Sequence, residues 1–207
     1  MASSAWPPSV SVPVRSPATV ATVAGEDWQF FEIDPEVVRI ARDPGLFRFL
    51  SACAPDARIV LGDGRLTLAA SPDRYDLIIL DVFSSDAIPV HVLTREAFAG
   101  YLARLAPRGV IAVHVSNRHM ELAGIVAAVA KESGLVATVR RDDTISDLAE
   151  DYRSNAEVVV LARNNADLGD LPSRDGWRSI EPPAGVTAWT DDYSDILRAI
   201  LRKKFGG

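Results

Sequence analysis

Residues 28–35 constrain the fold more than any other stretch of this chain of 207 residues. The run from Trp28 to Ile33 reads as a strand because aromatic and apolar residues dominate it. Asp34 and Pro35 follow at once, and an acid before a proline at the first helical position is typical of a helix start. A strand that passes directly into a helix predicts a β-α-β unit and a parallel sheet.

Later parts of the chain repeat this alternation. Residues 75–82 are almost wholly apolar, as expected of a central parallel strand buried on both faces. The last two expected strands are joined by the more polar segment 141–156, which favours an antiparallel edge. The pattern predicts an α/β fold with a doubly wound, mostly parallel Rossmann-like sheet and an antiparallel edge strand. The expected strands cover 28–33, 58–61, 75–82, 110–115, 135–140 and 157–162, the expected helices cover 35–50, 65–70, 94–105, 119–133 and 190–205, and 106–109 read as a turn.

Residues 1–20 differ from the rest of the chain because they are rich in Pro, Ser, Val and Ala. Residues 9–14 alternate like a weak strand, which Pro13 would confine to an edge or an end. In dinucleotide-binding α/β folds a glycine-rich turn follows the first strand, but residues 10–18 contain no glycine. We therefore divide the chain into an irregular N-terminal segment, 1–27, with a degenerate first strand and loop, and an α/β domain, 28–207.

Charge, cysteine content and hydropathy argue against several classes of function. With 22 basic and 28 acidic residues the net charge is −6, which disfavours a nucleic acid partner. Cys53 is the only cysteine, so no intrachain disulfide can form, which fits a reducing cytoplasm. No apolar run reaches membrane-spanning length, and no secretory signal pattern is present. We expect a cytoplasmic protein with no membrane segment in this chain.

Acidic residues stand at the ends of successive strands, where ligands bind in open α/β sheets. Glu32 lies at the tip of the strand 28–33, a position from which an acid can accept both hydroxyls of a nucleoside ribose. We place the neighbouring Ile33 in the same nucleoside site. The spacing of Asp34 and Pro35 instead favours a helix N-cap for Asp34.

Asp63 lies between two glycines after the strand 58–61. A turn of this composition would let the backbone at Gly64 approach a flat ligand and let the carboxylate of Asp63 reach an adenine amino group. The alternative is a tight turn in which Asp63 caps the following helix. The sequence leaves both interpretations open.

Asp81 ends the most apolar strand, and Asp86 follows five residues later. Partial burial would raise the pKa of a carboxyl at such a position and suit it to act as a general base. Together the two acids could hold a cationic amine and take its proton, although Asp86 could also cap its own loop. His114 is expected to be a satisfied core or cleft residue. The three histidines lack metal-ligand spacing, so we expect no metal site.

Several motifs together resemble the spermidine synthase family, the polyamine aminopropyltransferases with the class I S-adenosylmethionine-dependent methyltransferase fold. Segments 82–91, 114–118 and 189–193 are similar to bacterial spermidine synthase-like proteins that are often fused to membrane segments. The likeness runs from about Trp28 to Leu201. Its main motifs are Phe31-Glu32-Ile33-Asp34-Pro35, Gly62-Asp63-Gly64-Arg65, Tyr75-Asp76-Leu77-Ile78-Ile79-Leu80-Asp81 and Leu105-Ala106-Pro107-Arg108-Gly109-Val110.

The resemblance implies a role for each candidate residue. Glu32 would bind the ribose of decarboxylated S-adenosylmethionine, the co-substrate, and Asp63 with Gly64 would contact its adenine. Asp81 would help to deprotonate the attacking amine of putrescine, and Asp86 resembles a second amine-binding acid. The implied reaction transfers an aminopropyl group to a small-molecule amine and needs no metal.

The chain also departs from the family pattern. The family's glycine-rich loop would fall near 12–18, where Pro13, Arg15 and Pro17 stand instead, and we expect the family's N-terminal β-hairpin domain to be missing. We therefore interpret the chain as an N-terminally truncated or degenerate relative, in which self-association to a homodimer could cover exposed apolar surface. The alternatives are a small-molecule methyltransferase that uses S-adenosylmethionine and a catalytically inactive relative. An NAD-dependent dehydrogenase would need a Gly-x-Gly-x-x-Gly motif that the chain lacks.

Overall fold

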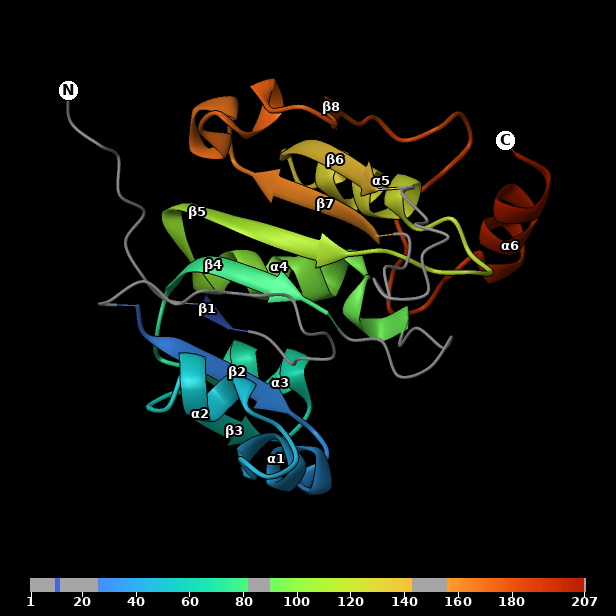
Figure 1. The fold of residues 1–207 in the computed structure, drawn as a ribbon. Coiled ribbons are helices and arrows are strands. Elements are labelled where there is room, and N and C mark those ends of the chain that lie inside the picture. Colours follow the sequence, from blue (N-terminus) through green and yellow to red (C-terminus); the bar gives the residue numbers. More distant parts are fainter. Residues whose placement is uncertain (1–9, 12–25, 82–89, 143–155, 207) are drawn as a thin grey trace.

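A computed structural model describes residues 10–11, 26–81, 90–142 and 156–206 (Figure 1). Its centre is an eight-stranded sheet with the order β3-β2-β1-β4-β5-β7-β6-β8. The strands are β1 (Val10–Ser11), β2 (Trp28–Glu32), β3 (Arg58–Leu61), β4 (Tyr75–Leu80), β5 (Leu105–His114), β6 (Val136–Asp142), β7 (Ala156–Ala162) and β8 (Trp177–Ser179). The helices are α1 (Pro35–Arg42), α2 (Phe49–Cys53), α3 (Gly64–Ala70), α4 (Arg95–Arg104), α5 (Ala123–Glu132) and α6 (Ile196–Phe205), with 3-10 turns η1 (Val90–Val92), η2 (Asn165–Leu168) and η3 (Leu171–Ser173).

The five strands from β3 to β5 are parallel, whereas β7 runs antiparallel between β5 and β6, and β8 is antiparallel to β6. This confirms the prediction of a mostly parallel sheet with antiparallel strands towards one edge. The weak strand expected near residue 10 lies between β2 and β4, in the middle of the sheet and not at its edge. Pro13 and the expected loop at 12–18 lie outside the described residues. Since the chain crosses from β3 over β2 and β1 to β4, the switch in strand order falls between β1 and β4.

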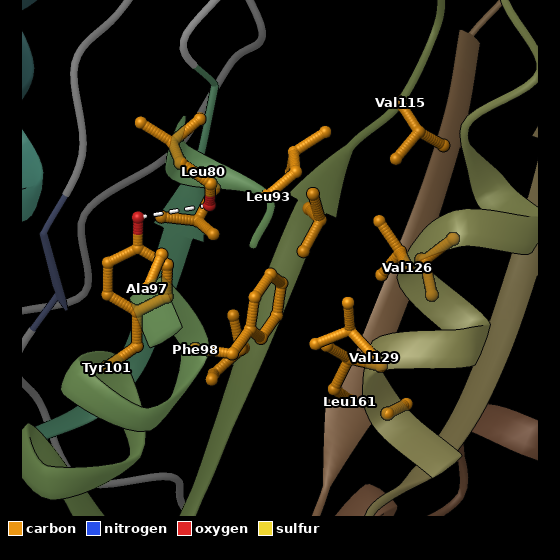
Figure 2. Close-up of a cluster of buried hydrophobic side chains, with 14 of the residues drawn as sticks. Leu80, Leu93, Ala97, Phe98, Tyr101, Val115, Val126, Val129 and Leu161 are labelled. Atoms are coloured by element: carbon orange, nitrogen blue, oxygen red, sulfur yellow. Dashed lines mark hydrogen bonds between the residues drawn. The ribbon is translucent and has the colours of Figure 1, made fainter. Parts of the chain in front are cut away.

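Helices or 3-10 turns cover both faces of the sheet. Helices α3, α4 and α5 pack on one face, where Phe98, Val126 and Val129 are fully buried (Figure 2). The Tyr101 hydroxyl in this layer donates to the backbone oxygen of Val92 over 3.1 Å. The other face packs against α1 and α2 around Trp28, and against η2 and η3 around residues of β5 and β7. The carboxyl ends of the parallel strands are left at one edge of this sandwich (Figure 1).

Three of the helices expected from the sequence begin late or end early. The helix expected over 119–133 is α5, which begins only at Ala123; the amides of His119 and Met120 donate instead to Asn117 Oδ1. The helix expected over 35–50 ends at Arg42 because Pro44 holds Asp43 in the extended region, at φ −80° and ψ 108°. The chain resumes helix only at Phe49. The last helix starts at Ile196 and not at residue 190, because the Asp195 side chain caps it by accepting from the Arg198 amide.

The expected turn at 106–109 is a bulge inside β5. Leu105 pairs with Tyr75 and Val110 with Leu77, so five steps along β5 match two along β4. Pro107 is tolerated there because a bulge leaves backbone groups unpaired. The Arg163 guanidinium satisfies the carbonyl oxygens of Ala106 at 2.6 Å and of Pro107 at 3.3 Å.

Candidate functional site

The tip of β2 presents one carboxylate with an accessible oxygen. Glu32 Oε1 accepts the Asp34 amide at 2.9 Å, and no partner of Oε2 lies among the described residues. Asp34 Oδ1 accepts the Glu36 amide at 2.8 Å, which confirms that Asp34 is the N-cap of α1. Glu32 is therefore the better candidate for binding a ligand, because the carboxylate of Asp34 has a structural role. Ile33 between them is 68% exposed.

The next strand tip forms the turn Gly62-Asp63-Gly64. The Gly62 amide donates to the Glu32 carbonyl at 2.9 Å, which ties this turn to the tip of β2. Asp63 caps α3, since its Oδ1 accepts the Leu66 amide at 3.0 Å, while Oδ2 lies 3.4 Å from His91 Nε2. The capping interpretation of Asp63 is thus confirmed, and its second oxygen faces a histidine at the same edge. Its predicted contact with adenine stays a prediction.

Only the first of the two glycines is required by the backbone. Gly62 has φ +141°, and a Cβ there would lie 2.7 Å from Thr67 Cγ2. Gly64 has an ordinary φ, and its Cβ would meet the Phe31 Cβ at 3.8 Å, a normal contact. A glycine at position 64 is therefore not needed for folding, which leaves room for a functional reason.

Exposed apolar side chains accompany these acids. Ile33 follows β2, Leu61 ends β3, and Leu66 lies in the first turn of α3, with exposed fractions of 68%, 56% and 67%. Leu61 is paired with Glu32 across the sheet. Large apolar residues so exposed at a strand edge can cover the face of a planar ligand.

The carboxylate at the end of β4 is held by its neighbouring strand. Asp81 Oδ1 lies 2.8 Å from His114 Nδ1, and His114 Nε2 lies 2.7 Å from Ser116 Oγ. Since Leu80 pairs with Val113, residues 81 and 114 follow as neighbours at the carboxyl ends of β4 and β5. This contact was not predicted from the sequence, because it depends on β4 and β5 being neighbours in the sheet. Asp86, the second expected amine-binding acid, lies outside the described residues.

A second polar cluster lies beside Asp63. The Arg65 guanidinium makes two 2.7 Å hydrogen bonds to the Asp191 carboxylate and one of 2.8 Å to the His91 carbonyl. Asp191 also accepts the Thr94 hydroxyl at 2.7 Å. The hydrogen bonds from Arg65 and then Thr94 lower the pKa of the Asp191 carboxyl to about 2. Arg65, Thr94 and Asp191 together form a clamp that fixes the segment 189–193 to the start of α3 and α4. The clamp was not predicted from the sequence.

Two further properties bear on the function. Within the described parts of the chain, no group of three or more His, Cys, Asp or Glu side chains could hold a metal ion. Across those same parts, every helix is too short or too polar to cross a membrane.

Comparison with known proteins gives partial matches. No protein-family model matches the chain. A curated protein, the probable polyamine aminopropyl transferase of Bifidobacterium longum (strain NCC 2705), is 36% identical over 61 residues. These are 30% of this chain and 14% of that protein, so the match spans a small part of the relative's length.

Solved structures match most of the chain. A probable spermidine synthase from Corynebacterium glutamicum ATCC 13032 has a TM-score of 0.60 and 18% identity, covering 91% of this chain and 74% of its own. The spermidine synthase from Thermotoga maritima has a TM-score of 0.55 and 12% identity, covering 97% and 69%. Human methyltransferase-like protein 13, solved in complex with SAH, has a TM-score of 0.52 and 18% identity, covering 77% and 73%.

The sheet order, the antiparallel β7 and these neighbours agree on one architecture, since the solved structures at these identities establish the fold. The curated match adds a named aminopropyl transferase from sequence alone. The chain therefore has the class I methyltransferase fold, and its resemblance to the spermidine synthase family is confirmed.

Proposed function

We propose that the protein transfers an aminopropyl group from decarboxylated S-adenosylmethionine to a small amine such as putrescine. The observation that carries this proposal is Asp81, a half-buried carboxylate at the end of β4 whose Oδ1 is held by His114. No partner of Oδ2 lies among the described residues, so this oxygen can accept a proton from an amine. The attack of an amine on the co-substrate requires such a carboxylate as a general base that removes the proton of the amine.

The donor set at the neighbouring strand tips fits the adenosyl part of such a co-substrate. Glu32 Oε2 offers an acceptor to ribose hydroxyls, and the exposed side chains of Ile33 and Leu66 offer apolar cover to a planar base. Asp63 Oδ2 supplies a second acceptor at the same edge, beside His91. The bound co-substrate supplies a carbon that is activated by the attached sulfonium. When the S–C bond breaks, the sulfur keeps the bonding electrons and leaves as part of methylthioadenosine.

The residues of the chain contribute positioning and proton removal. Glu32 and Asp63 would orient the nucleoside, and Asp81 would hold the amine nitrogen and accept its proton as the new N–C bond forms. Asp86 would hold the second, cationic end of a diamine. As the N–C bond forms, the positive charge passes from the sulfonium, which becomes a neutral thioether, to the amine nitrogen. The nitrogen then loses one proton, so the proposed reaction needs one proton acceptor.

The experiment is an assay of methylthioadenosine formed from decarboxylated S-adenosylmethionine and putrescine. We expect Asp81→Asn to lower kcat at least about 100-fold, because it removes the proton acceptor. The dissociation constant for methylthioadenosine should stay within about twofold of the original value. Asp56→Asn, an exposed acid before β3, is the matched control and should leave kcat unchanged. Full turnover by Asp81→Asn would remove Asp81 from the mechanism.

Methyl transfer is the second candidate, because human methyltransferase-like protein 13, which was solved with SAH, shares the fold. The nucleoside contacts would be the same, and the acceptor would differ. Formation of S-adenosylhomocysteine from S-adenosylmethionine, with no methylthioadenosine from the decarboxylated form, would favour this candidate. Absence of both products from a folded protein that binds the nucleoside would indicate an inactive relative.

A further inference from the structure

The hydrogen bonds around Asp81 continue from β4 through β5 to β7. Ser116 lies two residues beyond His114, where the ladder between β5 and β7 has ended. Its Oγ accepts the Glu157 amide at 2.6 Å, and the Val115 amide donates to the Glu157 carbonyl at 2.9 Å. The hydroxyl of Ser116 is therefore fixed to the backbone of β7.

This anchoring favours one of the two tautomers of the His114 imidazole. Ser116 Oγ already accepts from an amide, and its single proton can go to His114 Nε2 at 2.7 Å or to the Glu157 carbonyl at 3.4 Å. The 2.7 Å contact makes the stronger hydrogen bond, which favours the neutral tautomer of His114 that accepts at Nε2 and carries its proton on Nδ1. The Nδ1–H group then donates to Asp81 Oδ1 at 2.8 Å.

We propose that His114 is a positioning residue that orients Asp81 for proton removal, with Ser116 as its support. The hydrogen bond from Nδ1 fixes the carboxylate by Oδ1, which leaves Oδ2 for the amine. Half-burial of both groups, with exposed side-chain fractions of 31% for His114 and 19% for Asp81, limits the competition of water for these bonds. The inference rests on the proposed role of Asp81 as proton acceptor.

The variants His114→Ala and His114→Gln distinguish two roles of His114. In one role the imidazole only positions Asp81, and in the other it also transfers a proton. The glutamine amide has a donor and an acceptor about as far apart as the two ring nitrogens, so it can donate to Asp81 and accept from Ser116. It does not titrate. We expect His114→Ala to lower kcat about 10–100-fold, by analogy with the loss that follows removal of a side chain that orients a metal ligand. The KM for decarboxylated S-adenosylmethionine should stay within about twofold.

His114→Gln should recover kcat to within about fivefold of the original value. Ser116→Ala should cost less than His114→Ala, because the bond between His114 and Asp81 remains. His119→Gln, the same substitution at an exposed histidine, is the control and should leave kcat unchanged. In an Asp81→Asn background, His114→Ala should change kcat less than twofold, because His114 acts through Asp81.

The outcomes separate the inference from the function on which it rests. If the original protein forms no methylthioadenosine from the two substrates, the proposed function fails and the inference falls with it. If the original protein is active and His114→Ala keeps full kcat, the positioning role alone is refuted. If His114→Gln is as slow as His114→Ala, the imidazole does more than position Asp81, and this also overturns the inference.

Discussion

Gly62 and Gly64 flank Asp63 but should respond in opposite ways to the same substitution. Gly62→Ala forces a side chain onto a backbone with φ +141°, which costs about 1–3 kcal/mol. The new Cβ would also lie 2.7 Å from Thr67 Cγ2, and overpacking of this kind costs about 1–3 kcal/mol. Together these two costs lead us to expect Gly62→Ala to lower the free energy of unfolding by about 2–6 kcal/mol. Gly64→Ala should leave it unchanged or raise it by up to about 1 kcal/mol, because alanine suits a helix better than glycine.

Urea unfolding followed by circular dichroism measures both changes. Thr67→Ser removes Cγ2 but keeps the hydroxyl that donates to the Asp63 carbonyl at 2.7 Å. The double variant Gly62→Ala, Thr67→Ser should therefore recover the part of the unfolding free energy that the steric contact costs. The part that the unfavourable φ costs should remain lost. An unfolding midpoint for Gly62→Ala equal to that of the original protein would refute this reasoning. Gly64→Ala then tests whether the nucleoside approaches the backbone at Gly64. Loss of nucleoside binding without loss of stability would assign Gly64 to the site.

Two further predictions concern stability. Tyr75→Phe should lower the free energy of unfolding by about 1–3 kcal/mol, because the buried hydroxyl donates to Gln29 Oε1 at 2.8 Å and bonds to Ser71 Oγ at 2.7 Å; a thermal midpoint unchanged by the substitution would contradict this. The pKa of the Asp191 carboxyl is lowered to about 2 by its hydrogen bonds, first that from Arg65, so its stabilisation is present above the ordinary pKa and is lost as the pH falls towards 2. Asp191→Asn should therefore melt below the original protein at pH 7, by a difference that shrinks as the pH falls from 5 to 3, and a difference independent of pH would count against the clamp.

Features set by short stretches of sequence were predictable. The apolar run before Glu32 and the run before Asp81 gave both strand tips, because burial dictates the pattern of a parallel strand. The break after Arg42 was missed although Pro44 signals it, because the apolar spacing of the helix continues beyond the proline. The turn expected at 106–109 was wrong because proline and glycine also occur in bulges.

Features that join distant residues were not predictable from spacing. Arg65 and Asp191 are 126 residues apart, and the motif around either residue does not indicate that the other is its partner. The contact between Asp81 and His114 depends on β4 and β5 being neighbours in the sheet, which the order of strands along the chain does not guarantee. His114 was accordingly interpreted as a satisfied cleft residue, which describes its hydrogen bonds but not what they do to Asp81.

The most direct test of the proposed nucleoside site is calorimetric titration of the protein with decarboxylated S-adenosylmethionine, S-adenosylmethionine and methylthioadenosine. We expect binding in the micromolar range with a preference for the decarboxylated form over S-adenosylmethionine. Glu32→Gln should weaken binding of all three ligands by about 1.5–3 kcal/mol, as expected when a charged acceptor of ribose hydroxyls is lost. Binding of none of the three by the folded protein, or equal affinity of the Glu32→Gln variant, would contradict a nucleoside site at this edge of the sheet.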